Sequence, residues 1–464
     1  MENYTLGLTS LTDEQEPVRA QISGRLPKWL RGTLIRNGPA RWEAGADRLR
    51  HWFDGFAMLH AFTLDQTGVT YRSRFLRGPD WCAAKERGKL CHPQFATDPC
   101  RSFFKKVASL FVNELGCNPN VNVVKIGRRW LALTETPLAI EFDSQTLETL
   151  GLYDYDQDKL HRQITSAHPV LENGVLYNFT VKLGRETRYT AYRWPPGGER
   201  QPFAHHLTRT PAYLHSCALT ERELLLWEGP FTVKPLELLW RDRPYIENFR
   251  WRPELGSRLV RLGRDGHSQT FELPPLFVFH HVNSFYQGAC LCVDMLAYQD
   301  AGSVQQLYLD DLMKKGGEPV DTPDLVRVRV EGARARVETL SRTPLELPRI
   351  QEAQGQPYRY VYGITQRESR FYEGLVRLDT HTDTAQVWSE RGCFAGEPVP
   401  QKAPDGDETV LLSVVLDSTR GQSFLLVLDA ATMTERARAY VPAVVPFGFH
   451  GGFELCAVRE VAGR

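Results

Sequence analysis

The stretch TVLLSVVLDSTRGQSFLLVLDA, residues 409 to 430, consists of two apolar runs joined by a short polar segment. Both runs have the length of a β-strand and are rich in Val and Leu. The segment between them contains Asp417 and Gly421, which are residues that favour turns. Short apolar runs bounded by turn residues are typical of strands. This stretch therefore predicts two neighbouring buried strands.

The same alternation of apolar runs and turns continues along most of the chain. Examples are WLALTET (130–136), NGVLYNFTV (173–181), ELLLWEG (223–229), CLCVDMLAY (290–298) and YRYVYGIT (358–365). In three places a strand-like run ends in Asp with Thr three residues later, at Asp143, Asp379 and Asp429, where an Asp carboxylate can bond the backbone of a tight turn. No linker rich in Pro, Gly or Ser divides the chain, so we expect one all-β domain over residues 1–464. A propeller is one architecture that protects the edges of so many strands.

Composition excludes several classes of protein. Of 464 residues, 42% are hydrophobic and 24% are charged, and 56 basic residues balance 56 acidic ones, so neither a disordered chain nor a nucleic-acid partner is indicated. The N-terminus lacks the pattern of a secretory signal, and no apolar run approaches the ~20 residues that span a bilayer. Nine cysteines without a C-x-x-C pair favour a reduced, cytoplasmic protein. No obligate protein partner is indicated.

Four of the thirteen histidines lie in apolar or small-residue surroundings, where a charged imidazole would be costly. They are His168 in TSAHP, His215 in YLHSCALTE, His280 in VFHHVN and His450 in PFGFHGGF. Each alone is open to interpretation as a hydrogen-bonded structural histidine. If they meet, a closed radial fold must bring distant strands to one axis, and four neutral imidazoles then suit Fe(II), Zn or Cu.

Ligating imidazoles usually donate their second N–H to a carboxylate. Three glutamates in strand-like settings are candidates for this role, although each is also open to interpretation as a surface carboxylate: Glu135 in ALTETPL, Glu397 in FAGEPVP and Glu435 in MTERARA.

These segments resemble the motifs of the carotenoid cleavage oxygenases. LPKWLRGTLIRNGPARW (26–42) and RHWFDGFAMLHAF (50–62) resemble the N-terminal signature of that family, and LALTET, SAHP, LHSCALTE, FHHVNSF, GEPVP and VPFGFHGGF follow in the order of the family. YRSRFLR, TDPCRSFFKKV and CVDMLAYQD are most similar to the animal branch, which contains the β-carotene cleaving oxygenases and the retinoid isomerohydrolase.

The resemblance implies a seven-bladed β-propeller with a helical and loop cap over one face. It also implies Fe(2+) on the propeller axis, held by His168, His215, His280 and His450. Within FHHVN we favour His280 over His281, because the family places the ligand three residues before the Asn and adjacent strand residues point to opposite faces.

The resemblance to the family also implies which glutamate orients which histidine. Glu135 would orient His215, Glu397 would orient His280, and Glu435 would orient His450, while His168 would have no carboxylate partner.

The resemblance further implies cleavage of a conjugated double bond of a carotenoid or apocarotenoid, with O2 as co-substrate and two carbonyl products, by central 15,15' cleavage. Val121 matches the position that crowds an open coordination site of the iron, and Tyr298 matches an aromatic that stabilises a cationic polyene. For Tyr298 the alternative is a core residue on a strand.

Other functions remain open at this stage. Within the family they are stilbenoid cleavage and retinyl-ester isomerohydrolysis. Outside it, a non-catalytic propeller scaffold does not account for four histidines in these motifs. A zinc hydrolase needs a general base such as the Glu of H-E-x-x-H, and no such residue stands beside a candidate ligand in this sequence.

A membrane-facing segment is predicted at residues 103–115, FFKKVASLFVNEL. Its apolar residues recur at roughly helical spacing opposite Lys105 and Lys106, as in a helix lying in a membrane interface. The alternative is a helix packed on the propeller. Cys100 matches a position that is acylated in a vertebrate relative, and acylation here is left open. We therefore expect a cytoplasmic protein with peripheral membrane contact.

Overall fold

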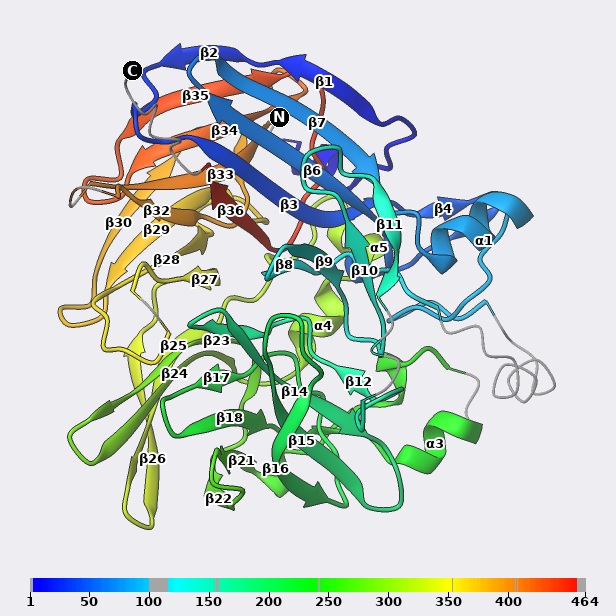
Figure 1. The fold of residues 1–464 in the computed structure, drawn as a ribbon, viewed down its shortest axis with the longest axis vertical. Coiled ribbons are helices and arrows are strands. Elements are labelled where there is room, and N and C mark those ends of the chain that lie inside the picture. Colours follow the sequence, from blue (N-terminus) through cyan, green and yellow to red (C-terminus); the bar gives the residue numbers. More distant parts are fainter. Residues whose placement is uncertain are drawn as a thin grey trace.

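The computed structural model describes residues 3–99, 116–153, 155, 158–240, 243–352, 354–404, 406 and 408–456. In this part of the chain, seven antiparallel sheets of four to six strands surround a common centre (Figure 1). The predicted all-β, seven-bladed propeller is confirmed. We number these sheets as blades one to seven in the order in which the chain runs around the ring.

Blades one to three contain the N-terminal half of the propeller. Blade one comprises β1 (Gln15–Arg19), β7 (Gly68–Phe75), β6 (Phe56–Asp65), β3 (Gly32–Arg41) and β36 (Gly451–Leu455). Blade two comprises β11 (Thr149–Tyr153), β10 (Ala139–Phe142), β9 (Arg129–Leu133) and β8 (Asn122–Ile126). Blade three comprises β12 (Ile164–Thr165), β13 (Val170–Glu172), β14 (Val175–Lys182), β15 (Thr187–Trp194) and β16 (Gln201–Thr208).

Blades four to seven complete the ring. Blade four comprises β17 (Ala218–Leu219), β18 (Glu223–Glu228), β21 (Ser257–Gly263) and β22 (Ser268–Leu273). Blade five comprises β23 (Phe277–Gln287), β24 (Cys290–Tyr298), β25 (Asp324–Glu331) and β26 (Arg334–Ser341). Blade six comprises β27 (Glu346–Arg349), β28 (Tyr360–Thr365), β29 (Gly374–Asp379) and β30 (Thr384–Ser389). Blade seven comprises β2 (Gln21–Gly24), β35 (Glu435–Val441), β34 (Gln422–Asp429), β33 (Thr409–Asp417), β31 (Cys393–Ala395) and β32 (Val399–Lys402).

The apolar runs of residues 409 to 430 form the centre of blade seven. β33 pairs with β34 from Val410 opposite Asp429 to Asp417 opposite Gln422, and nearly every side chain of the pair is buried. The Asp-Thr turns also form: the backbone N–H of Thr146 donates to Asp143 over 2.7 Å, and that of Thr432 donates to Asp429 over 2.9 Å.

The two ends of the chain close the ring together. N-terminal β2 adds to blade seven by pairing with β35, and C-terminal β36 adds to blade one by pairing with β3. Figure 1 shows these blue and red strands lying beside strands from the opposite end of the sequence. Blades one and seven therefore each contain strands from both ends of the chain.

Helices and loops cover one face of the ring, as the cap prediction requires. The 3-10 helix Trp52–Asp54 meets α4 (Gly302–Gln306) and α5 (Leu309–Leu312) there, and the backbone N–H of Trp52 donates to Leu307 over 3.0 Å. The remaining short elements are α1 (Pro79–Arg87), α3 (Pro235–Trp240), the 3-10 helices Tyr4–Leu8, Ile246–Asn248 and Pro253–Leu255, and the strand pairs β4 (Glu43–Ala44) with β5 (Asp47–Arg48) and β19 (Phe231–Thr232) with β20 (Arg250–Trp251).

The predicted membrane-facing segment 103–115 and Cys100 lie outside the described residues. Among the described residues, no helix combines the length and the apolar character needed to span a bilayer.

Candidate metal centre

The innermost strands of the blades contact one another in a ring around the axis. β17 contacts β23 and β23 contacts β27, while on the other side β32 contacts β36 and β36 contacts β8. Each blade brings a histidine or a glutamate to this ring, at the end of or beside one of its inner strands. They are His450 from blade one, Glu135 from blade two, His168 from blade three, His215 from blade four, His280 from blade five, Glu346 from blade six and Glu397 from blade seven.

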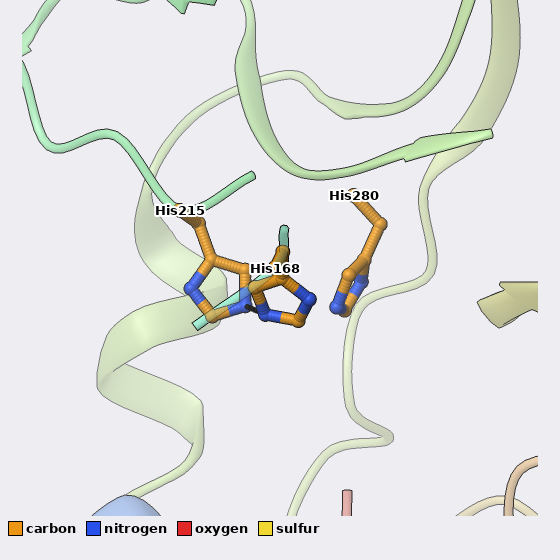
Figure 2. A group of neighbouring side chains, drawn as sticks. All are labelled: His168, His215 and His280. Carbon is orange, nitrogen blue, oxygen red and sulfur yellow. Dashed lines mark hydrogen bonds between the residues drawn. The ribbon is translucent and has the colours of Figure 1, made fainter. Parts of the chain in front are cut away.

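The four predicted histidines meet at the axis. The candidate ligand nitrogens of His168, His215 and His280 all lie within 4.8 Å of one another, and Figure 2 shows the three rings converging from separate segments. His168 Nε2 is 2.9 Å from His215 Nε2. The ring of His450 completes the cluster, with its centroid 4.6 Å from that of His168 and 5.2 Å from that of His280.

His280 rather than His281 belongs to this cluster. The pairing of β23 with β24 is irregular between Val278 and Asn283, and such bulges re-aim side chains. His280 turns to the axis, whereas His281 Nδ1 lies 2.8 Å from the hydroxyl of Ser216.

Burial favours the neutral form of two of these imidazoles, those of His168 and His450. It lowers the pKa of His168 well below the ordinary range, and the neighbouring His215, His450 and His280 lower it further. Burial also lowers the pKa of His450 to about 4, although the adjacent Glu397 acts in the opposite direction. Neutral imidazole is the form that binds a metal ion.

Three of the four imidazoles have a carboxylate partner at Nδ1. Glu135 lies 2.6 Å from His215, Glu346 lies 2.7 Å from His280, and Glu397 lies 2.7 Å from His450. An Nδ1–H that donates to a carboxylate leaves the lone pair on Nε2, the nitrogen that faces the centre in His215 and His280. Among the described residues no carboxylate bonds His168, whose backbone N–H donates to Ser166.

Two of the predicted glutamate assignments are wrong. Glu397 contacts His450 and not His280, and the partner of His280 is Glu346. The reason is the order of the blades: blade seven adjoins blade one, which carries His450, and blade six adjoins blade five, which carries His280.

Glu435 does not reach the centre at all. It begins β35, which is separated from the inner strands of blade seven by β34 and β33. Its carboxylate instead accepts hydrogen bonds from Arg438 over 2.5 and 2.7 Å. This glutamate therefore stabilises the outer part of blade seven.

Sequence reasoning missed Glu346. The residue lies in LELP, where an acidic side chain stands between two leucines, and this pattern is the one signal that marks it as a buried carboxylate. It is 5% exposed. Burial acts to raise its pKa, but the electrostatic interaction with His280, together with hydrogen bonds from His280, Leu347 and Tyr298, outweighs that effect and holds its pKa below the ordinary value.

Two cavities meet the histidine cluster. The first is lined mainly by apolar and aromatic side chains, including Trp52, Phe279, Leu307, Ile364 and Phe449, together with His215, His280 and His450. The second lies on the side of Glu135 and carries more polar groups, among them Gln94, Asn118 and Tyr245. The cluster therefore lies where a long apolar molecule can approach it.

Val121 and Tyr298 both line the first cavity, and Val121 also lines the second. The Val121 carbonyl accepts the backbone N–H of His450 over 3.2 Å, which fixes this apolar side chain next to the cluster. Tyr298 donates its hydroxyl to Glu346 over 2.8 Å, so it is linked to His280 through that carboxylate.

The residues present fit a divalent transition metal. His280 Nε2 is buried and has no hydrogen-bond partner among the described residues, and an unpartnered buried nitrogen is costly unless it binds something else. The 2.9 Å between the Nε2 atoms of His168 and His215 also suits two ligands at right angles on one ion, each about 2 Å from it.

Comparisons with known proteins agree with this geometry. Residues 8–454 match the family described as retinal pigment epithelial membrane protein. Human β,β-carotene 15,15'-dioxygenase is 30% identical over 95% of this chain and 93% of its own, and carotenoid isomerooxygenase of Galleria mellonella is 29% identical over 94% of each.

Solved structures give the same result. A variant of Synechocystis apocarotenoid oxygenase superimposes with a TM-score of 0.88 at 25% identity, and the cobalt-substituted form of that enzyme superimposes with 0.87, each over 98% of both chains. A match over nearly the whole length, in sequence and in fold, identifies the chain as a member of the retinal pigment epithelial membrane protein family, the family of the carotenoid cleavage oxygenases.

Proposed function

We propose that this protein is an Fe(2+)-dependent dioxygenase that cleaves a conjugated double bond of a carotenoid or apocarotenoid to give two carbonyl products, by central 15,15' cleavage. The observation that carries the proposal is the convergence of four imidazoles, from four blades, beside an apolar cavity. The human and insect relatives named above, a β-carotene dioxygenase and a carotenoid isomerooxygenase, support the choice of substrate class.

The chain itself binds and orients the substrate. Apolar and aromatic side chains of the first cavity bury a polyene, with about 25 cal/mol gained for each Å² of apolar surface removed from water. The cap residues Trp52 and Leu307 line this cavity and are joined by a backbone hydrogen bond. A polyene lying across the cluster then presents its double bonds to the four imidazoles.

The glutamates hold the ligands ready. Glu135, Glu346 and Glu397 each accept an Nδ1–H and so fix the tautomer and orientation of one imidazole. When bound there, ferrous iron would supply the binding and activation of dioxygen. Val121 would leave a position beside the ion open to that gas, because its apolar side chain offers no ligand atom and leaves no room for a larger molecule.

Tyr298 has a ring in the cavity and a hydroxyl on Glu346, and we assign the ring to stabilisation of positive charge on the polyene. Tyr298→Phe should keep most of the turnover, since the aromatic face remains. Tyr298→Leu should lower kcat about tenfold at unchanged iron content. Equal activity of the Phe and Leu variants in a steady-state assay would remove the ring from the mechanism.

Product analysis tests the substrate and the bond. The iron-loaded protein is incubated in air with β-carotene and a shorter apocarotenal, and chromatography should give two aldehydes from central cleavage. Aldehydes that come from another bond would show that cleavage is not central. Turnover of a stilbenoid alone would show that the substrate is not a carotenoid or apocarotenoid. An anaerobic incubation with retinyl ester separates the isomerohydrolase, which needs no oxygen. Retention of full activity and metal by His280→Ala would contradict the proposal.

Peripheral membrane contact from a cytoplasmic location is part of the same proposal. Carotenoids partition into bilayers, and the sequence of 103–115 places Phe and Leu opposite paired lysines. A variant with Phe103, Phe104 and Phe111 changed to Ser should float less with anionic liposomes than the parent protein. Unchanged flotation would remove this segment from membrane binding.

A further inference from the structure

The three glutamates that contact the cluster differ in what else they bind. Glu135 accepts the hydroxyl of Tyr213 over 3.0 Å, and Glu346 accepts the hydroxyl of Tyr298 over 2.8 Å. Both partners are neutral. Glu397 instead contacts two guanidinium groups, those of Arg36 and Arg349. The histidine cluster is therefore surrounded by an uneven distribution of charge.

The two arginines reach Glu397 from the blades on either side of it. Arg349, the last residue of β27 in blade six, donates Nε to Glu397 Oε1 over 2.7 Å, and this oxygen also accepts from His450 Nδ1. Arg36, on β3 in blade one, donates to Oε2. Both arginines and His450 therefore hold the carboxylate in one orientation.

The same arginines hold the backbone on both sides of His450. Arg36 donates Nη2 to the carbonyl of Phe449 over 2.7 Å, and Arg349 donates Nη2 to the carbonyl of Gly451 over 2.8 Å. The N–H of Gly451 returns to Glu397 Oε2 over 3.1 Å. His450 is thus fixed by its ring and by the peptide groups before and after it.

The charges in this group do not cancel. One carboxylate faces two guanidinium groups. Glu397 is 1% exposed and Arg36 is 5% exposed, so solvent screens these two charges weakly, whereas the Arg349 side chain is 34% exposed and its charge is screened more. A net positive charge beside a metal ion disfavours any further positive charge on that ion.

We infer that Arg36 and Arg349 are positioning residues that hold His450 through Glu397 and favour the ferrous over the ferric state of the bound ion. The inference rests on the proposed function, since it requires iron at the four imidazoles. The two arginines, from blades one and six, then protect Fe(2+) against loss of an electron to dioxygen when no polyene is bound.

Arg349→Gln is the variant of choice, because Arg36 remains to pair with the buried Glu397. Arg349→Lys keeps the charge. Arg258→Gln is the matched control: Arg258 also pairs with a buried carboxylate, Glu228, over 2.7 Å, and its side chain is 29% exposed against 34% for Arg349. Arg258 and Glu228 line neither of the two cavities that meet the cluster.

Each protein is loaded with Fe(2+) without oxygen, its iron content is measured, and air is admitted in the absence of polyene. Appearance of ferric iron is followed by electron paramagnetic resonance. We expect Arg349→Gln to oxidise about tenfold faster than the parent, and Arg349→Lys and Arg258→Gln to oxidise at the parental rate. A reduction potential measured by titration with mediators should be lower in Arg349→Gln alone.

The outcomes separate the inference from the proposed function. If the parent and Arg349→Gln bind one iron per chain and oxidise at the same rate, the inference is wrong and the proposed function stands. If Arg258→Gln oxidises as fast as Arg349→Gln, the effect is one of general destabilisation and the inference is again wrong. If the parent binds no iron, both fail.

Discussion

At the scale of single residues, the centre is built so that each imidazole has one nitrogen to give to a metal. The carboxylates at His215, His280 and His450 accept a hydrogen bond from Nδ1, which leaves Nε2 free to bind the ion, and burial lowers the pKa of His450. Mutation of a carboxylate that orients a ligand in this way typically lowers metal affinity or activity by about 10- to 100-fold.

Glu346→Gln tests this role. The amide keeps the size of the side chain but donates rather than accepts at one position, so the Nδ1–H of His280 loses its anionic acceptor. We expect iron affinity, measured by competition with a chelator, to fall about 10- to 100-fold. Glu435→Gln is the control and should bind iron like the parent, because Glu435 contacts Arg438. A larger loss of iron affinity in Glu435→Gln than in Glu346→Gln would favour Glu435, the residue expected from the sequence, as an orienting carboxylate.

The sequence identified the histidines but not all of their partners. His168, His215, His280 and His450 stand out because imidazoles in apolar segments are unusual. Glu346 and Glu397 could not be paired with them in advance, because the pairing depends on which blades are neighbours in space. Blades one and seven are neighbours because the ring closes where the two ends of the sequence meet.

At the scale of elements, the approach of two backbones places His450. Gly448 precedes β36, and a Cβ added there would lie 2.7 Å from the carbonyl oxygen of Asn37 on β3. The backbone carbonyl of Asn37 also accepts the backbone N–H of Phe449 over 3.1 Å, and the backbone N–H of Asn37 donates to the backbone carbonyl of His450 over 3.0 Å. The absence of a side chain at Gly448 lets the two strands come this close.

Gly448→Ala should force these strands apart. Because the clash is with backbone, we expect the free energy of unfolding of the metal-free protein to fall by about 1–3 kcal/mol in urea and the iron content to fall with it. Gly184→Ala is the matched control, since its new Cβ would be 3.4 Å from the nearest atom, an ordinary contact. Equal stability and iron content of the two variants would show that the close approach is not needed.

Strands of ordinary length were predictable, and the shortest ones were not. β33 and β34 follow directly from the apolar runs between residues 409 and 430. β12 and β17 have two residues each, which is too few for any periodicity, yet they hold the segments that carry His168 and His215. Their conformation is set by pairing with β14 and β18.

At the scale of the whole molecule, closing the ring buries several titratable groups. Burial lowers the pKa of His51 and His60 to about 3, against about 6.5 in an unfolded chain. Between these pH values the unfolded chain binds more protons, so the free energy of unfolding falls as the pH falls. Burial raises the pKa of Asp54 to about 6, which acts in the opposite direction and offsets one histidine in part.

We therefore expect the metal-free protein to lose stability between pH 7 and pH 5 in urea unfolding. His51 and His60 each contribute a loss of about 2 kcal/mol between pH 7 and pH 5. His60→Gln removes one titrating group, and its loss over this range should be smaller than that of the parent. An equal loss in both proteins would mean that His60 does not remain neutral in the folded state.

The central claim is that imidazoles from four blades share one ferrous ion on the axis of the ring. Anomalous diffraction at the iron absorption edge, from crystals of the protein loaded with Fe(2+) without oxygen, tests it most directly. We expect a single peak within bonding distance of the Nε2 atoms of His168, His215, His280 and His450. A peak elsewhere, or an iron-free centre in protein that has been fully loaded, would contradict the account.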